Sequence, residues 1–513
     1  MINAGLRMLL KDKIHINSSI LIFAVIAIWY AITNFLWWHI NTPIFPVYGS
    51  QAGHFLEIFK DNVSSPPLIT RITGLMFCVF GKEHFDLIII FINYIFFLIP
   101  LYFIYKIGKA IDSREAGNIA MVLFAMVPAV YALSRHYGNK DFHIIGAITF
   151  NIYCLLKTDS FKNRKWSLLY GVSVGLGLLV KEQFIGYFSA PLLWTIIVSL
   201  RQQVKRHVIT NIVFSGIIAC IMGALHYADP EAIKKVFMDP VIQSKSIFSY
   251  ESFHVMIFDW YEQLLSLPIF LISLAGLWYF IKNYKTDSKT VILLWIFVPW
   301  TLVFLMPHYK LSVYFSGSIP AVILVASIFI THIKINKLKR RLIMFLLAIG
   351  IIQYINFSYF PEQGLGNIEI TVKGKIFRYY YADNRDMLYF SDEDRSSLVN
   401  FIEYIRKLCA DSNLSVYVND KSKINGKVLR TAMLLNDIKC LPKDMERFVL
   451  KYKHDTILVV GELPIEIKKN KRIITQNFDM VATAFYFDGI DDKNNQIRIF
   501  KRKQTEKREK KSV

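Results

Sequence analysis

The sequence has few charged residues and few cysteines for its length. Only 19% of its 513 residues are charged, whereas soluble domains carry about 25%, which argues against an ordinary soluble protein. The five cysteines show no CxxC spacing, and no HExxH motif is present, so no metal site is predicted. No cofactor is predicted with certainty, and a divalent cation stays an open alternative.

Acidic residues are also scarce: 39 against 60 basic residues, a net charge of +21. In a soluble protein that excess would suggest a nucleic-acid partner. Here 54% of the residues are hydrophobic, and basic residues characteristically flank membrane helices. We therefore expect membrane lipids as partners and no nucleic acid.

The apolar residues form long blocks, and a membrane-spanning helix needs about 20 such residues. The pattern predicts an all-α polytopic bundle of about eleven transmembrane helices. Their approximate bounds are 19–38, 85–104, 116–134, 142–156, 166–180, 184–200, 208–226, 263–281, 290–307, 315–333 and 342–360. The predicted membrane domain is thus 1–360, with a large first outer loop at 39–84.

The loops orient this bundle. With the N-terminus in the cytoplasm, the inner segments hold about 21 Lys and Arg in about 60 residues, and the outer loops about 10 in nearly 100, which is the positive-inside pattern. Residues 68–80 are apolar but short, and spanning there would reverse every later loop. We predict an interfacial or re-entrant helix for them. The N-terminal segment is interpreted as a retained signal anchor.

Residues 361–500 are ordinary globular sequence, placed outside by the odd number of spans, and 501–513 form a basic tail. Residues 393–408 and 426–438 predict helices, whereas 414–418 and 456–461 predict buried strands. The alternation indicates a small extracytoplasmic α/β domain. Cys409 and Cys440 lie in this domain, and the sequence leaves their pairing open.

Ionisable residues near membrane depth are costly and usually face a cavity. Asp141 begins one predicted span, where it serves either as a general base or as a helix cap. Lys181 ends another, where it binds a phosphate, pairs with Glu182 or extends to the interface.

Two further groups lie in predicted outer loops. Lys310 and Tyr314 either grip a phosphate or anchor the membrane interface. His54 and Glu57 are three residues apart and share a helix face, which fits a site or a solvated interfacial helix equally. These groups gather basic and acidic side chains on one membrane face, as expected of an enzyme acting on a lipid-linked phosphate.

Over about residues 20–330 the chain resembles the dolichyl-phosphate-mannose protein mannosyltransferases and the bacterial lipid A aminoarabinose transferases, within the GT-C glycosyltransferase superfamily. The features that carry the resemblance are Pro66-Pro67-Leu68, Ser113 through Gly117, Ser134-Arg135 followed by Asp141, Gly171 through Lys181, and Lys310 with Tyr314 and Pro320. The resemblance implies a GT-C-like fold that moves a sugar from a polyprenyl-phosphate carrier to a lipid, glycan or protein acceptor, with inversion.

The resemblance also assigns roles to residues. Asp141 matches the second acidic position of the family. Lys181, Lys310 and Tyr314 match positions near the donor phosphate, to which Arg135 is added as a further cation.

The acidic base of the family's first loop is replaced here by Ser50-Gln51, and neither side chain titrates near neutrality. Either Asp141 or Glu57, one turn beyond His54, has taken over as base, or the loop is aligned wrongly, or catalysis is lost.

Retained catalysis, as a hexosyl- or pentosyl-transferase of the cell envelope, is the favoured hypothesis. The alternatives are a non-catalytic subunit that binds a lipid-linked sugar, and a transporter or flippase. The short loops favour a bacterial cytoplasmic membrane.

Overall fold

The structure is a computed structural model that describes residues 2–41, 58, 66–135, 140–201, 206–228, 253–284, 286–305 and 312–359, together with six strands between 369 and 502. The chain divides into two compact units. The first comprises Met1–Ile40, Asp61–Phe80 and His84–Tyr389, and the second comprises Asn41–Lys60, Gly81–Glu83 and Phe390–Val513.

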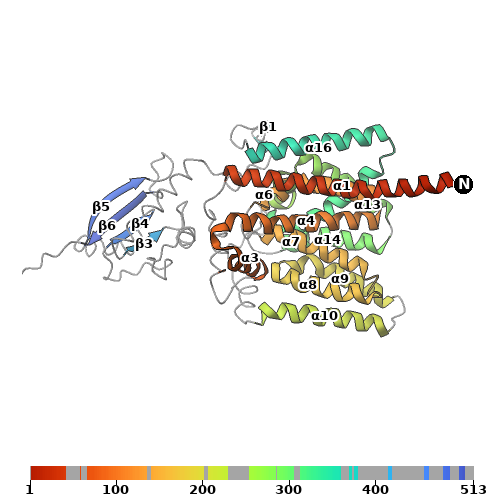
Figure 1. The fold of residues 1–513 in the computed structure, drawn as a ribbon, viewed down its shortest axis with the longest axis horizontal. Helices are drawn as coiled ribbons and strands as arrows, with labels where there is room; N and C mark the ends of the chain where they lie inside the picture. Colours follow the sequence, from red (N-terminus) through yellow and green to blue (C-terminus); the bar gives the residue numbers. More distant parts are fainter. Residues whose placement is uncertain are drawn as a thin grey trace, which may run out of the picture. The chain divides into compact units, whose positions relative to one another are not determined.

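The first unit is a bundle of helices packed side by side (Figure 1). Its α-helices are α1 (Ile2–Asn41), α3 (Leu68–Phe80), α4 (Phe85–Ile111), α5 (Arg114–Ala125), α6 (Pro128–Leu133), α7 (Lys140–Lys157), α8 (Arg164–Val180), α9 (Phe184–Arg201), α10 (Arg206–Tyr227), α13 (Leu267–Asn283), α14 (Asp287–Leu305), α15 (Ile319–Thr331) and α16 (Asn336–Tyr359). Its short 3-10 and π-helical segments are η2 (His254–Phe258), η3 (Trp260–Leu265) and η4 (Ser312–Ser318), and η1 (Lys82–His84) has residues of both units.

Six of these helical segments are long and apolar enough to cross a membrane: Ser18–His39, Leu87–Ile111, Phe184–Arg201, Arg206–Tyr227, Asp287–Leu305 and Tyr314–Thr331. The other five predicted spans also fall on helices, but these are shorter, more polar or interrupted, so the count of eleven stays a prediction. Residues 68–80 form the 13-residue helix α3, in line with the short helix expected there.

The predicted span at 116–134 is interrupted in the structure. Helix α5 ends at Ala125, and α6 starts at Pro128, because proline lacks the N–H that a continuous helix needs and fits at a first helical position. The start of α5 is capped by the Ser113 hydroxyl, which accepts from the Ala116 amide at 3.1 Å.

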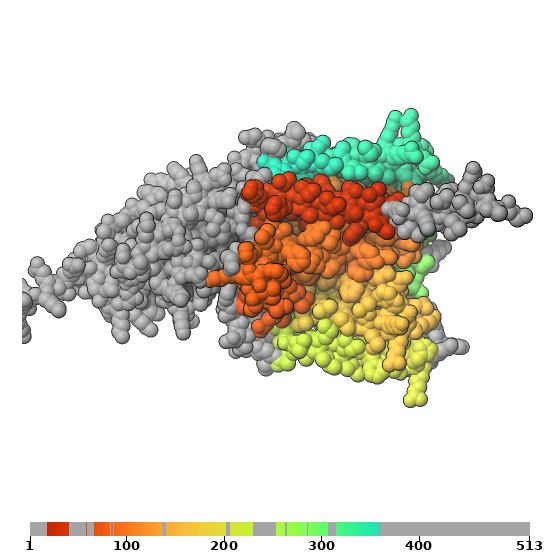
Figure 2. Space-filling model, in the orientation of Figure 1, coloured from red at the N-terminus to blue at the C-terminus, as the bar shows by residue number. Residues whose placement is uncertain are grey.

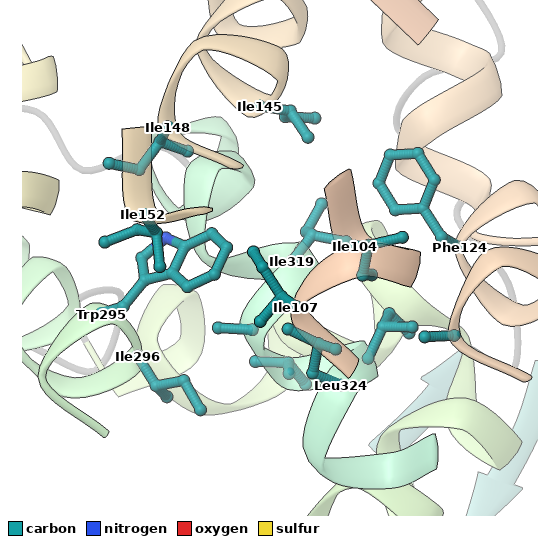
Figure 3. Close-up of a cluster of buried hydrophobic side chains, with 14 of the residues drawn as sticks. Ile104, Ile107, Phe124, Ile145, Ile148, Ile152, Trp295, Ile296, Ile319 and Leu324 are labelled. Atoms are coloured by element: carbon teal, nitrogen blue, oxygen red, sulfur yellow. The ribbon is translucent and has the colours of Figure 1, made fainter. Parts of the chain in front are cut away.

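The core lies around α15. In the apolar stretch Tyr314–Thr331, which ends with α15, 83% of the residues are buried, against 28% in the most apolar stretch of α1 and 22% in that of α10. Figure 3 shows Ile319 and Leu324 of α15 among side chains of α4, α5, α7 and α14, including the fully buried Trp295. Helices α1, α4 and α10 form surface in Figure 2 and carry many exposed large apolar side chains. Such a surface is unusual in water and suits a lipid environment.

The described strands form two sheets. In the first unit β1 (Glu369–Val372) pairs antiparallel with β2 (Lys375–Arg378). In the second unit the order is β3-β4-β6-β5, with bounds Leu414–Val418, Thr456–Val460, Gln496–Arg502 and Phe478–Phe485 in that order. Strands β3 and β4 are parallel, and the other pairs are antiparallel.

Strands β3 and β4 match the two predicted strands. The predicted helices 393–408 and 426–438, Cys409 and Cys440 lie outside the described residues, so the α/β class of this domain stays a prediction. Lys501 and Arg502, which the sequence assigned to the basic tail, end strand β6, and the rest of the tail lies outside the described residues.

Helix α8 packs closely on α10 through Gly171. A Cβ added there would overlap the carbonyl oxygen of Ser215 and lie 3.0 Å from its carbonyl carbon and Cα. Since backbone atoms cannot move aside as a flexible side chain can, only glycine permits this approach. The contact matters for the site because α8 ends just before Lys181.

Asp112, which follows α4, forms hydrogen bonds that link three interhelical connections: α4 to α5, α13 to α14 and α15 to α16. Its Oδ1 accepts from the Tyr284 hydroxyl and lies 2.7 Å from His332 Nε2. Its Oδ2 accepts from Ser113 at 2.7 Å and from Thr331 at 3.3 Å. Burial raises the pKa of Asp112, but the hydrogen bonds from Tyr284, His332 and Ser113 outweigh it and hold the pKa below its usual value.

We expect Gly171→Ala to lower the stability of the bundle by about 1–3 kcal/mol, the usual cost of overpacking. Gly216→Ala in the neighbouring helix is the control, because a Cβ there meets nothing within 4 Å. Thermal unfolding of both purified variants in the same detergent measures the difference, and equal melting temperatures would contradict the close approach.

Replacing Asp112 by Asn should destabilise the protein at pH 7 by about 1.5–3 kcal/mol, the usual contribution of a charged hydrogen bond. A lowered folded-state pKa stabilises above the unfolded-state value of about 3.9, and this contribution is lost as the pH falls through the folded-state pKa. The gap between wild type and variant should therefore narrow below about pH 4. Melting temperatures between pH 3 and pH 7 test this, and a constant gap would refute it.

Candidate functional site

The first turn of α7 sends three side chains to three different elements. The Lys140 ammonium donates to the carbonyl oxygen of Pro66, at 3.0 Å. The His143 Nε2 lies 3.0 Å from the side-chain oxygen of Asn93 in α4. Between them, Asp141 accepts a hydrogen bond from Lys181. The start of α7 is thereby fixed to α4, to the end of α8 and to the segment before α3.

Asp141 and Lys181 form a largely buried ion pair. Their side chains are 19% and 10% exposed, respectively. Lys181 directly follows α8 with an extended backbone, and its amide donates to the Gly177 carbonyl oxygen at 3.1 Å. Of the alternatives open for Lys181, the structure therefore shows pairing, but with Asp141 and not with the adjacent Glu182. Asp141 lies in the first turn of α7, where the helix dipole also stabilises a negative charge.

Two residues of η4 contact this ion pair. The Lys181 ammonium lies 5.5 Å from the centroid of the Tyr314 ring, within the range of a cation–π contact. The Ser316 hydroxyl donates to the backbone oxygen of Asp141 at 2.8 Å. The structure thus brings together three residues that the sequence predicted for one site: Asp141, Lys181 and Tyr314.

The position of η4 is fixed by hydrogen bonds from neighbouring helices. The Tyr187 hydroxyl of α9 donates to the Tyr314 carbonyl oxygen and accepts from the Gly317 amide at 3.3 Å. The Trp295 indole of α14 donates to the Gly317 carbonyl oxygen at 2.8 Å. These bonds fix the backbone of η4, which carries the Tyr314 ring beside the ammonium.

Arg135 makes its contacts elsewhere. Arg135 is 2% exposed, and its guanidinium donates hydrogen bonds to Asn34 in α1 and Tyr354 in α16. Neither partner belongs to the elements that hold the Asp141–Lys181 pair. The remaining predicted site residues, namely Ser50, Gln51, His54, Glu57 and Lys310, lie outside the described residues, and their roles stay predictions.

Sequence reasoning missed Lys140, Tyr187 and Ser316. Lys140 was visible as a lysine next to Asp141, and Ser316 belongs to a small-residue run directly after Tyr314. Tyr187 carries no signal of its own, because an aromatic residue within an apolar helix is indistinguishable from a packing residue.

The arrangement combines a cation that can bind an anion with a carboxylate that can accept a proton. The described residues contain no cluster of three or more His, Cys, Asp or Glu suited to a metal ion. The candidate groups for such chemistry are the Asp141 carboxylate, the Lys181 ammonium and the Tyr314 ring.

Residues 64–226, from just before α3 to the end of α10, match the dolichyl-phosphate-mannose-protein mannosyltransferase family. This confirms the resemblance predicted from the sequence, and the matched stretch includes Asp141 and Lys181. No curated protein sequence matches the chain.

The fold is similar to that of ArnT from Cupriavidus metallidurans. The structure bound to undecaprenyl phosphate gives a TM-score of 0.58 at 10% identity, covering 94% of this chain and 97% of that chain. The apo structure gives a TM-score of 0.59 at 11% identity, covering 94% and 98%. At such identities the likeness shows a shared fold, and it extends over nearly the whole chain.

We expect Asp141→Asn alone to destabilise the protein by about 3 kcal/mol or more, because it leaves a buried ammonium without its counter-charge. Adding Lys181→Met should recover much of that loss. The matched control is the Glu115–Lys339 pair, at 3.2 Å, in which Glu115 is 53% and Lys339 13% exposed; because its carboxylate reaches solvent, its coupling should be under about 1 kcal/mol.

Double-mutant cycles on both pairs, followed by thermal or denaturant unfolding, measure the two coupling energies. Similar couplings for the two pairs would show that the Asp141–Lys181 contact is no stronger than a surface ion pair.

Proposed function

We propose that this chain is a membrane glycosyltransferase that moves a sugar from a polyprenyl-phosphate carrier to an acceptor on the outer membrane face, with inversion. The observation that carries the proposal is the buried Asp141–Lys181 pair beside Tyr314, inside the stretch similar to the mannosyltransferases. The fold is also similar to that of ArnT, which was crystallised with undecaprenyl phosphate.

Lys181 is proposed to bind the phosphate of the donor. That phosphate is the leaving group, and a fixed positive charge beside it lowers the barrier to departure. An ammonium carries three donors, so Lys181 can turn toward the phosphate while Tyr314 keeps it in place. Lys310 is proposed as a second cation for the same group.

Asp141 is proposed as the general base that takes the proton from the acceptor hydroxyl. The phosphate and the Asp141 carboxylate compete for the same ammonium. Donor binding therefore weakens the hold of Lys181 on Asp141 and leaves the carboxylate more available to the acceptor. This competition orders the reaction, with the donor bound before the acceptor proton is removed.

A second candidate is a non-catalytic subunit that binds a lipid-linked sugar. The observation that favours it is Ser50-Gln51, which stand where the family has its acidic first-loop base. Under that hypothesis Lys181 still binds the phosphate, whereas Asp141 only balances its charge. The two functions therefore differ in what Asp141 contributes once the donor is bound.

The test is turnover of the purified full chain in lipid vesicles with a panel of polyprenyl-phosphate sugars. Asp141→Asn should lower the transfer rate at least about 100-fold, the lower bound for removing a general base, with donor binding retained. Lys181→Ala should weaken donor binding. Glu115→Gln and Lys339→Ala, which remove the charges of the Glu115–Lys339 pair, should leave both the transfer rate and donor binding unchanged.

Donor binding without turnover in the wild type would favour the binding subunit. Turnover that survives Asp141→Asn would remove Asp141 as the base. Accumulation of substrate inside the vesicles without transfer would favour the transporter hypothesis instead.

A further inference from the structure

Arg135 is a buried cation surrounded by aromatic rings. It follows α6 and is 2% exposed. Its guanidinium carbon lies 4.8 Å from the ring centroid of Trp37, 5.1 Å from that of Tyr354 and 5.7 Å from that of Tyr131. The rings belong to α1, α16 and α6, so Arg135 joins three helices.

The hydrogen bonds of Arg135 leave its charge uncompensated. Nε donates to the Asn34 side-chain oxygen at 3.1 Å, and one terminal nitrogen donates to the Tyr354 hydroxyl at 2.8 Å. The other terminal nitrogen, Nη1, is buried without a hydrogen-bond partner. Across the described part of the chain, no acidic residue forms an ion pair with Arg135. A buried charge without a counter-charge is costly, so this arrangement favours an external anion.

Helix α16 presents further unused polar groups beside Tyr354. The side-chain amide of Gln353 and the hydroxyl of Ser358 are buried, and none of their oxygen or nitrogen atoms has a partner. Ser358 lies four residues after Tyr354 and therefore on the same helix face. A hydroxyl and an amide can donate to an anion's oxygens, as Arg135 Nη1 can.

A cavity of about 440 Å³ is lined by residues of α1 and α4 and by Ser134, the residue before Arg135. Its size is that of an ordinary ligand pocket. Its walls include Ile32, Phe35, Leu87 and Phe91, all more than half exposed on the apolar surface of the bundle. Its polar lining consists of Tyr30, Asn34, Asn93, Tyr94 and Ser134. Asn34 thus both lines the cavity and bonds to Arg135.

We propose that Arg135 and the α1–α4 cavity together bind an anionic membrane phospholipid other than the polyprenyl-phosphate carrier. The phosphate oxygens accept from Arg135, whose planar fork suits a phosphate, and a hydrocarbon chain of the same lipid lies in the cavity. The charge selects an anionic headgroup, and the exposed apolar walls select a membrane lipid over a soluble anion. This site differs from Lys181 and does not depend on glycosyl transfer.

The experiment is a thermal-shift titration of the purified full chain in uncharged detergent. The probes are phosphatidylglycerol, phosphatidylcholine with the same chains, a polyprenyl monophosphate and inorganic phosphate. Phosphatidylglycerol should raise the melting temperature, and phosphatidylcholine and inorganic phosphate should not. Arg135→Gln should weaken the apparent affinity at least about tenfold, and Arg135→Lys less, because lysine keeps the charge but loses the fork.

Arg164→Gln, which removes an exposed arginine, and Lys181→Ala should leave the phosphatidylglycerol titration unchanged. Equal weakening by Arg135→Gln and Arg164→Gln would overturn the site in favour of general charge attraction. Loss of binding in Lys181→Ala would also overturn it, because the lipid would then lie at Lys181. Dependence on Arg135 for the polyprenyl phosphate alone would also overturn it, because Arg135 would then belong to the donor site.

A second pair of variants tests the chain-binding part without touching Arg135. Leu87→Trp narrows the cavity, whereas Leu193→Trp makes the same change on α9 at a side chain that is 60% exposed and lies outside the cavity lining. Phosphatidylglycerol should bind more weakly to the first variant only. Equal binding to both would refute the cavity as the chain site, even if Arg135→Gln fails to fold.

Discussion

The cost of leaving a charge unpaired inside an apolar helical bundle governs where the polar residues of this protein lie. Asp141 meets Lys181 directly, and Asp112 collects hydrogen bonds from four side chains. Arg135 is held by aromatic rings and neutral partners. In each place a polar group of one helix needs a group from another helix, so the same contacts that satisfy the charges also fix the packing of the bundle.

The candidate site residues gather where α-helices end. Lys181 follows α8 in extended conformation, Tyr314 lies in the 3-10 helix η4, and Arg135 follows the short helix α6. Helix ends leave backbone groups unsatisfied, which side chains can then use. Tyr187 does so by bonding to Tyr314 and Gly317. The rigid helices between these ends keep the functional groups at defined positions.

The two polar sites are linked through the start of α7. Asn93 donates to the carbonyl oxygen of Ser134, next to Arg135, and its side-chain oxygen contacts His143, two residues after Asp141. A lipid phosphate at Arg135 and a donor phosphate at Lys181 would therefore lie on elements that share direct contacts. Under both proposals, the bound phospholipid and the transferred lipid-linked sugar would occupy separate sites joined by Asn93.

The sequence by itself determined the membrane class, most helix positions, the two strands β3 and β4, the family resemblance and the candidates Asp141, Lys181 and Tyr314. These follow from local apolar runs and from short motifs. Only the tertiary structure decided that Lys181 pairs with Asp141 and not with Glu182, and that Arg135 turns toward α1 and α16. The physical reason is that these contacts join residues about 40, 100 and 220 positions apart, which local periodicity does not encode.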